Sequence, residues 1–90
     1  MAKPEKPILA YSIVQEENLA KISARTIDLI VRRGLNLGEI LRVASEKYSG
    51  KGGGHNIAAG AQVPIQDLES FIKLVNELVK EQLEAPSVAS

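Results

Sequence analysis

The last third of the sequence carries one long apolar stripe, and this stripe most constrains the fold. Apolar residues, with Phe71 among them, recur at helical spacing from Ile65 to Leu83, and mostly charged or amide residues lie on the other side. Such a pattern predicts an amphipathic helix, ending before Pro86, that must bury one face. Because the chain has only 90 residues, it has one small core in which to bury that face.

Two segments near the N-terminus predict a β-hairpin. Residues 8–14 are apolar and β-branched, and they follow Pro7. Residues 19–26 alternate between two faces, with Lys21, Ser23 and Arg25 on one side and Ala20, Ile22 and Ala24 on the other. The four polar residues 15–18 between the two segments predict the turn.

The middle of the chain predicts two helices. Residues 26–34 fit either a short helix capped by Thr26 or a further strand, and the helix is favoured. Asn36 followed by Glu39 has the form of a capping box. Apolar residues at helical spacing follow directly and predict a second helix over 37–48.

Glycine is concentrated at one place, where four of the seven glycines occupy positions 50–54. Consecutive glycines are useful where the backbone takes positive φ or where a ligand approaches it closely. Exposed N–H groups in such a loop form an anion-binding concavity. Lys51, His55 and Asn56 add donors to either side of the glycines. The segment is therefore predicted to be an anion-binding loop, and a flexible linker is the alternative.

The order of these elements predicts an α+β fold. The small apolar residues 57–63 predict a third strand stopped by Pro64. The chain then reads strand, strand, helix, glycine loop, strand, helix, which predicts a two-layer sandwich with a sheet of three or more strands covered by helices. Residues 8–84 are expected to form this domain, with a disordered lead-in at 1–7 and a disordered tail at 85–90.

Composition narrows the class of site and the compartment. The chain has no cysteine and one histidine, so it lacks the residues for a thiolate or histidine-based metal site. No apolar run approaches the ~20 residues of a membrane helix, and a cytoplasmic location is expected. Net charge is zero, but residues 1–51 hold nine Lys and Arg against six Asp and Glu. This excess is too weak to identify a nucleic-acid-binding protein by itself.

The glycine segment resembles a known signature. Gly52-Gly53-Gly54-His55 followed by Ala58-Ala59-Gly60 resembles the motif of the DHHA1 domain, the C-terminal domain of DHH-family phosphoesterases. Residues 22–26 resemble the S-A-R strand of that domain, and residues 36–41 resemble the helix that follows it. The resemblance spans about residues 8–84 and is strongest to archaeal RecJ-like exonucleases.

The resemblance implies a function and a set of site residues. A DHHA1 domain grips the substrate while an N-terminal DHH domain supplies divalent Mn or Mg for phosphodiester hydrolysis. It implies single-stranded DNA or RNA as the ligand, and the DHH domain and the replication complex GINS as partners. Self-association through exposed strand edges or through the long final helix is a further expectation from the residues themselves. The substrate-binding residues it implies are Arg25, Gly52, Gly53, Gly54 and His55, with His55 assisting at the phosphate. Lys51 and Asn56 are added to this site as the further donors beside the glycines.

The chain departs from the family at the catalytic centre. It contains no Asp-His-His motif, so no metal is expected here and the isolated chain is expected to be inactive. One alternative is an RNA-binding module like the C-terminal domain of alanyl-tRNA synthetases. His55 and the segment Ala58-Ala59-Gly60 favour the phosphoesterase branch instead. A second alternative is a protein-interaction domain of a replication-associated complex.

Overall fold

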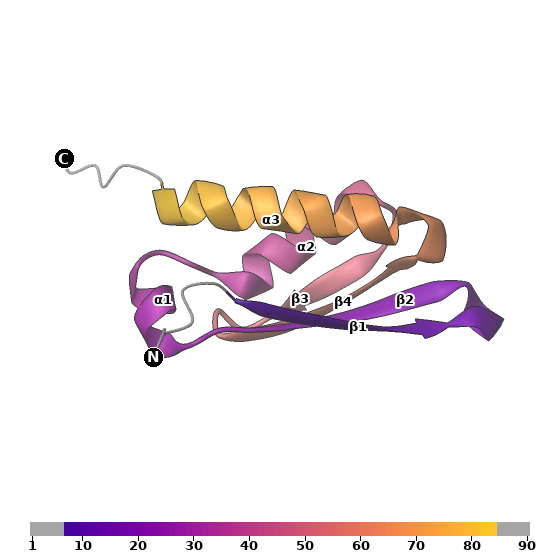
Figure 1. The fold of residues 1–90 in the computed structure, drawn as a ribbon, viewed down its shortest axis with the longest axis horizontal. Coiled ribbons are helices and arrows are strands. Elements are labelled where there is room, and N and C mark those ends of the chain that lie inside the picture. Colours follow the sequence, from indigo (N-terminus) through magenta and orange to yellow (C-terminus); the bar gives the residue numbers. More distant parts are fainter. Residues whose placement is uncertain (1–6, 85–90) are drawn as a thin grey trace.

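A computed structural model describes residues 7–84 (Figure 1). It shows the predicted α+β sandwich, with one sheet and one layer of helices. The strands and helices are β1 (Ile8–Val14), β2 (Leu19–Arg25), α1 (Asp28–Arg32), α2 (Leu37–Lys47), β3 (Lys51–Gly54), β4 (Ala58–Pro64) and α3 (Leu68–Glu84), with 3-10 turns η1 (Gln15–Glu17) and η2 (Ile65–Asp67). The disorder predicted at the two ends lies outside the described residues, except for Pro7.

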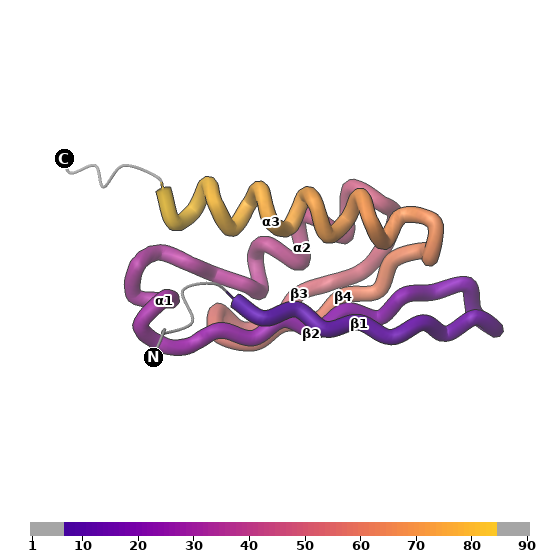
Figure 2. Tube along the Cα trace, in the orientation of Figure 1, coloured from indigo at the N-terminus to yellow at the C-terminus, as the bar shows by residue number. Residues whose placement is uncertain are grey.

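The four strands form one antiparallel sheet in the order β1-β2-β4-β3. Two hairpins, β1–β2 and β3–β4, are joined side by side through the pairing of β2 with β4 (Figure 2). At the middle of the sheet, Ile22 lies opposite Tyr11 on one side and Ala61 on the other. The first hairpin and its turn are confirmed, and β1 and β3 are the two edges of the sheet.

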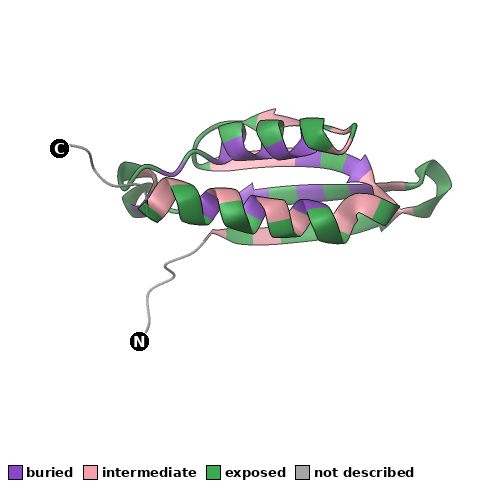
Figure 3. Ribbon diagram, turned by 90° about the horizontal axis from the view of Figure 1, so that it is seen from above, coloured by how far each residue is buried: buried purple, intermediate pink, exposed green. Residues whose placement is uncertain are grey.

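The core lies between the sheet and the helices α2 and α3, which run side by side over one face (Figure 3). The buried apolar residues are Ala20, Ile22, Ala24, Ile30, Leu35, Leu37, Ile40, Leu41, Ala44, Ala61, Val63, Phe71, Val75 and Val79. The predicted stripe of the last helix supplies three of them, so its role as a cover is confirmed. No helix within residues 7–84 is long and apolar enough to cross a membrane.

One of the two hydrogen bonds of the capping box predicted for α2 is confirmed. The Asn36 side chain accepts a hydrogen bond from the Glu39 N–H at 3.1 Å. The reciprocal bond of a capping box is replaced by a tertiary one, because the Asn36 N–H donates to Oε1 of Gln82 on α3 at 2.7 Å. The start of α2 is therefore held both locally and by α3.

Segment 26–34 forms a helix, as favoured, but the predicted cap is wrong. Helix α1 begins at Asp28 with Ile27 as its N-cap, and no side chain caps it. Thr26 is held at the end of the sheet instead, since its N–H donates to the Ile57 carbonyl at 3.0 Å. Gly34, with a φ of +113°, follows the helix.

The glycine segment is a strand, and the prediction of a loop is wrong. Residues 51–54 pair along β4, so the segment predicted as the third strand is the fourth. A Cβ on Gly52 would lie 2.6 Å from the Leu41 carbonyl oxygen and 2.8 Å from Oγ of Ser45. Gly52 therefore lets α2 lie directly on β3. This packing is sufficient reason for a glycine at position 52, and no bound ligand is needed to explain it.

Candidate functional site

The sheet face that carries no helix, called the open face, presents three rows of side chains beside a fourth, apolar row made of Val14, Leu19 and Pro64. Ala20, Ile22 and Ala24 are buried beneath the helices, so the alternate residues of β2 point away from the helices. The pairing register extends each of them into a row across the strands. The rows are Ile8, Arg25 and Ala58; Ala10, Ser23, Gly60 and Gly53; and Ser12, Lys21, Gln62 and Lys51.

The middle row is made only of small residues. Ala10, Ser23, Gly60 and Gly53 leave the sheet nearly bare between the two outer rows. A Cβ on Gly53 would meet no heavy atom within 4 Å, so packing does not require glycine there, whereas its φ of +153° favours one. Shallow hollows lie along this face on both sides of Lys21. The open face can therefore admit an extended ligand close to its backbone.

The outer rows carry cations without carboxylates. Lys21, Arg25 and Lys51 are exposed, and no Asp or Glu stands in any of the three rows. The two ion pairs found within residues 7–84, Arg32–Asp28 and Arg42–Glu46, both lie on helices. None of the three open-face cations thus has a carboxylate within 4.0 Å in the described chain, and the face attracts anions.

The structure brings Arg25 and His55 to the same end of the open face. The His55 N–H donates to the Ala58 carbonyl at 2.8 Å, and Ala58 pairs with Arg25 on its other side. Two strand spacings separate the backbones of Arg25 and His55, roughly 10 Å. Lys51 stands at the other end of β3, about 10 Å along the strand from Gly54. The predicted site residues thus form a band across the sheet rather than one loop.

The glycine amides are available at the edge of the sheet. Hydrogen-bonded and non-hydrogen-bonded pairs alternate in an antiparallel ladder. Since the His55 N–H bonds to Ala58, this alternation turns the N–H groups of Gly52 and Gly54 away from β4, toward the unpaired side of β3. Two outward amides, two residues apart on β3 and close to His55, replace the concave loop that was predicted.

The start of α2 does not add donors to this site. The N–H of Leu37 donates to the Asn56 carbonyl at 3.1 Å, and that of Gly38 donates to the His55 carbonyl at 2.9 Å. These bonds consume the amides that a helix N-terminus would otherwise offer an anion. They also fix the backbone of His55 and Asn56. Both residues nevertheless remain exposed to solvent.

Sequence reasoning missed Lys21 and Gln62 as members of this surface. Gln62 lies between Lys21 and Lys51 in one row. The two lysines are far apart in the sequence, but only two strand spacings separate them in the sheet. The alternation of residues 19–26 had already placed Lys21 on the face of Arg25. What was missing was the register of β2 against β4, which local sequence does not reveal.

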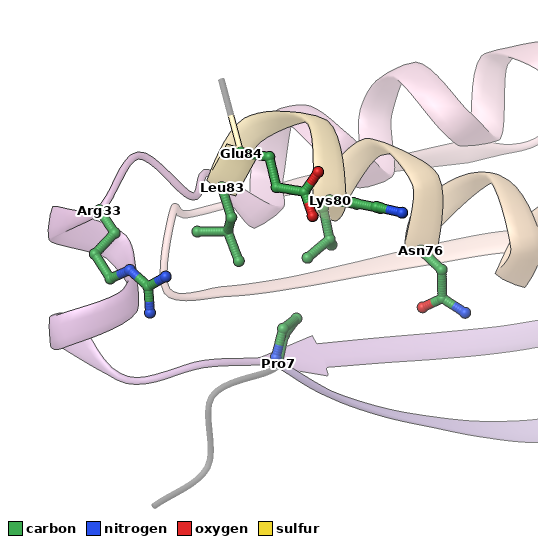
Figure 4. Close-up of a pocket in the computed structure, with 7 residues that line it drawn as sticks. Pro7, Arg33, Asn76, Lys80, Leu83 and Glu84 are labelled. Atoms are coloured by element: carbon green, nitrogen blue, oxygen red, sulfur yellow. The ribbon is translucent and has the colours of Figure 1, made fainter. Parts of the chain in front are cut away.

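A further hollow lies away from the open face. It is a groove between the C-terminal half of α3 and the start of β1, where Leu83 points toward Pro7 and the charged ends of Arg33 and Glu84 flank it (Figure 4). Its lining contains none of the predicted site residues. The groove is therefore separate from the open face.

The described residues do not fit a divalent-metal site. Within residues 7–84, no three His, Asp or Glu side chains lie close enough together to hold a metal ion.

One polar group beside the site has no partner. The hydroxyl of Thr26 is buried and makes no hydrogen bond to any group of residues 7–84. A buried unsatisfied hydroxyl destabilises a fold by about 1–3 kcal/mol. We therefore expect Thr26→Val to raise the free energy of unfolding by about 1 kcal/mol, measured by urea denaturation followed by circular dichroism. A loss of stability in the valine variant would show that the hydroxyl is bonded in solution.

Comparison with known proteins adds a family match. The DHHA1 domain, as a sequence family, matches residues 1–81 of the chain. The chain is also 44% identical over 79 residues to an uncharacterized protein of Methanocaldococcus jannaschii. That alignment covers 88% of this chain but 18% of the relative. The chain therefore spans less than a fifth of the length of this relative.

Proposed function

Since the chain belongs to the DHHA1 domain family, typically the accessory domain of DHH-family phosphoesterases, we propose that it grips a single-stranded nucleic acid for a RecJ-like phosphoesterase. In this proposal the open face holds the sugar-phosphate backbone, and His55 with the outward amides of Gly52 and Gly54 holds one phosphate. A DHH domain outside this chain supplies the divalent metal, Mn or Mg, and the hydrolysis.

The observation that carries the proposal is the charge of the open face. Lys21, Arg25 and Lys51 stand on one face without a carboxylate among them. Lys21 and Arg25 are four residues apart on one strand, roughly 13 Å, and Lys21 and Lys51 are two strands apart, roughly 10 Å. Such spacing suits several phosphates of one extended chain rather than a single small anion.

The same face predicts little discrimination between bases. Sequence-tolerant binding proteins of this kind often stack bases on aromatic side chains. The aromatic residues of the described chain are Tyr11, Tyr48 and Phe71, and none belongs to the three rows of the open face. Binding should therefore be dominated by phosphate contacts and depend strongly on salt.

A titration of the labelled chain with a short single-stranded DNA at low salt tests the proposal. Backbone amide shifts should be confined to the open face and to residues 51–56. Three phosphate contacts predict that log K falls against log salt with a slope of about −2. Arg25→Ala should weaken binding roughly three- to tenfold and reduce that slope by about 0.7, because one contact is lost. His55→Ala should weaken binding without changing which amides shift.

The matched control is Arg42→Ala. Arg42 carries the same charge, is exposed, and lies on α2 in the helix layer. Its removal should leave the salt slope unchanged. Equal losses from Arg25→Ala and Arg42→Ala would contradict a specific surface. Shifts confined to α3 and α1 on adding a protein partner would favour the interaction-domain alternative, and tighter binding of an RNA of equal length would favour the RNA-binding alternative.

A further inference from the structure

The edge strand β1 has none of the features that usually protect a sheet edge. It pairs with β2 on one side along seven residues without a bulge, and its other side has no strand beside it in the described chain. The strand Ile8–Val14 contains no charged residue and no proline. Proteins commonly block such an edge with charge, proline, a bulge or a very short strand.

Three of the seven large apolar side chains that are exposed within residues 7–84 lie on this strand. Ile8 is 67% exposed, Tyr11 59% and Ile13 40%. Tyr11 and Ile13 lie on the helix side of the sheet, because they pair with the buried Ile22 and Ala20, yet the helices leave them uncovered. The opposite edge differs, since β3 has only four residues, of which three are glycine and one is Lys51.

The order of residues in β1 identifies the partner. Read from either end, the strand has side chains of similar size around Tyr11: the aliphatic Ile8 matches Val14, the aliphatic Leu9 matches Ile13, and the small Ala10 matches the small Ser12. A second copy paired antiparallel about Tyr11 therefore places like side chains opposite each other along the whole strand. We propose that two copies of this chain associate through β1, with Tyr11 facing Tyr11 of the partner copy across a two-fold axis.

The pairing satisfies both the backbone and the side chains. Outward backbone groups alternate along the strand, and this alternation is symmetric about Tyr11, so each outward N–H finds a carbonyl in the partner copy. On the helix side, Leu9 meets Ile13 of the partner copy. On the open side, Ile8 meets Val14 of the partner copy. No like charges are brought together, because the strand has none.

The size of the seam, meaning the contact between the two paired β1 strands, predicts a weak dimer. A seven-residue strand is about 24 Å long. Counting the side chains of both faces, the seam buries on the order of 400–500 Å² per protomer, about half of a standard interface. We therefore expect a dissociation constant on the order of 100 µM. Because antiparallel pairing keeps the same face upward, the two open faces would join into one eight-stranded surface.

Mass measured against concentration tests the association. The mass should rise from the 9.7 kDa of one chain toward twice that value between about 20 µM and 1 mM. Tyr11→Lys should weaken the dimer at least tenfold, because two lysines then face each other at the axis. Val43→Lys is the matched control, since Val43 is 41% exposed on α2, and it should dimerise like the parent chain. A mass of one chain at 1 mM would overturn the proposal.

Cross-linking tests the register independently of affinity. The chain has no cysteine, so Tyr11→Cys introduces a single thiol. Directly opposed residues have Cα atoms about 4.5–5.5 Å apart, within the range of a disulfide. Oxidation should therefore trap a covalent dimer of this variant. Ile8→Cys is equally accessible but would lie roughly 20 Å from its copy, and it should not cross-link. Equal cross-linking of both variants, or of neither, would overturn the antiparallel register about Tyr11.

Discussion

Replacing Gly38 with alanine is expected to lower the free energy of unfolding by about 3–5 kcal/mol. Gly38 lies in the first turn of α2, where alanine would ordinarily stabilise a helix by about 1 kcal/mol. Here an added Cβ would collide with the carbonyl oxygen of Gly54 and lie 2.8 Å from its carbonyl carbon. Both atoms are backbone, so relief requires α2 to move away from β3, and the packing loss exceeds the helical gain.

Urea unfolding followed by circular dichroism measures this loss, with Gly60→Ala as the control. The nearest atom to a Cβ on Gly60 is the Ile22 carbonyl oxygen at 3.4 Å, an ordinary contact, and the side chain would point to the open face. That variant should change stability by less than about 1 kcal/mol. If Gly38→Ala proves as stable as Gly60→Ala, the close approach of α2 to β3 does not exist in solution.

Because Gly60 belongs to the bare middle row, Gly60→Ala should weaken nucleic-acid binding while the fold is intact.

Phe71→Ala is expected to cost a similar amount, about 3–5 kcal/mol. Phe71 is the only phenylalanine of the chain and is fully buried where α3 meets the sheet. The other buried members of the core are aliphatic, and truncation of the ring leaves a cavity among them. A domain of this size has roughly 5–10 kcal/mol of stability in total. The variant should therefore retain at most a small margin of stability at 25 °C.

Thermal and urea unfolding check this prediction against two further variants. At about 4–8 °C per kcal/mol, Phe71→Ala should lower Tm by roughly 15 °C or more. Phe71→Leu keeps most of the apolar volume and should cost less. Lys73→Ala changes an exposed position of the same helix and should stay within about 0.5 kcal/mol. A small effect of Phe71→Ala would mean that α3 is not docked on the sheet as described.

The elements with regular side-chain patterns were predictable from sequence. The first hairpin follows from apolar and alternating segments, the last helix from its stripe, and the start of α2 from Asn36. Each of these signals is local, because a strand or helix with one buried face repeats its apolar residues at its own period. The ambiguous segment 26–34 contains the short helix α1, which begins only after Thr26 because that residue stays with the sheet through its bond to Ile57.

The glycine strand β3 was not predictable by the same means. Three glycines have no side chains, so they show no period, and their conformational freedom favours a loop. The strand exists because β4 pairs with it and α2 packs closely over it, contacts made between segments separated in the sequence. Position 52 requires glycine because a carbonyl of α2 lies against it, and the neighbouring residues along the chain give no sign of this contact.

The candidate site divides in the same way. By itself, the sequence determined the residue types: one histidine, a glycine run beside Lys51, and Lys21 with Arg25 on one side of a strand. Only the tertiary structure decided that these residues share a face, because β2 pairs with β4 and β4 with β3 in one particular register. A shift of one residue in that register would send every side chain of a strand to the other face. Local periodicity specifies which face of each strand is buried, whereas the partner and register of that strand depend on packing summed over the whole core.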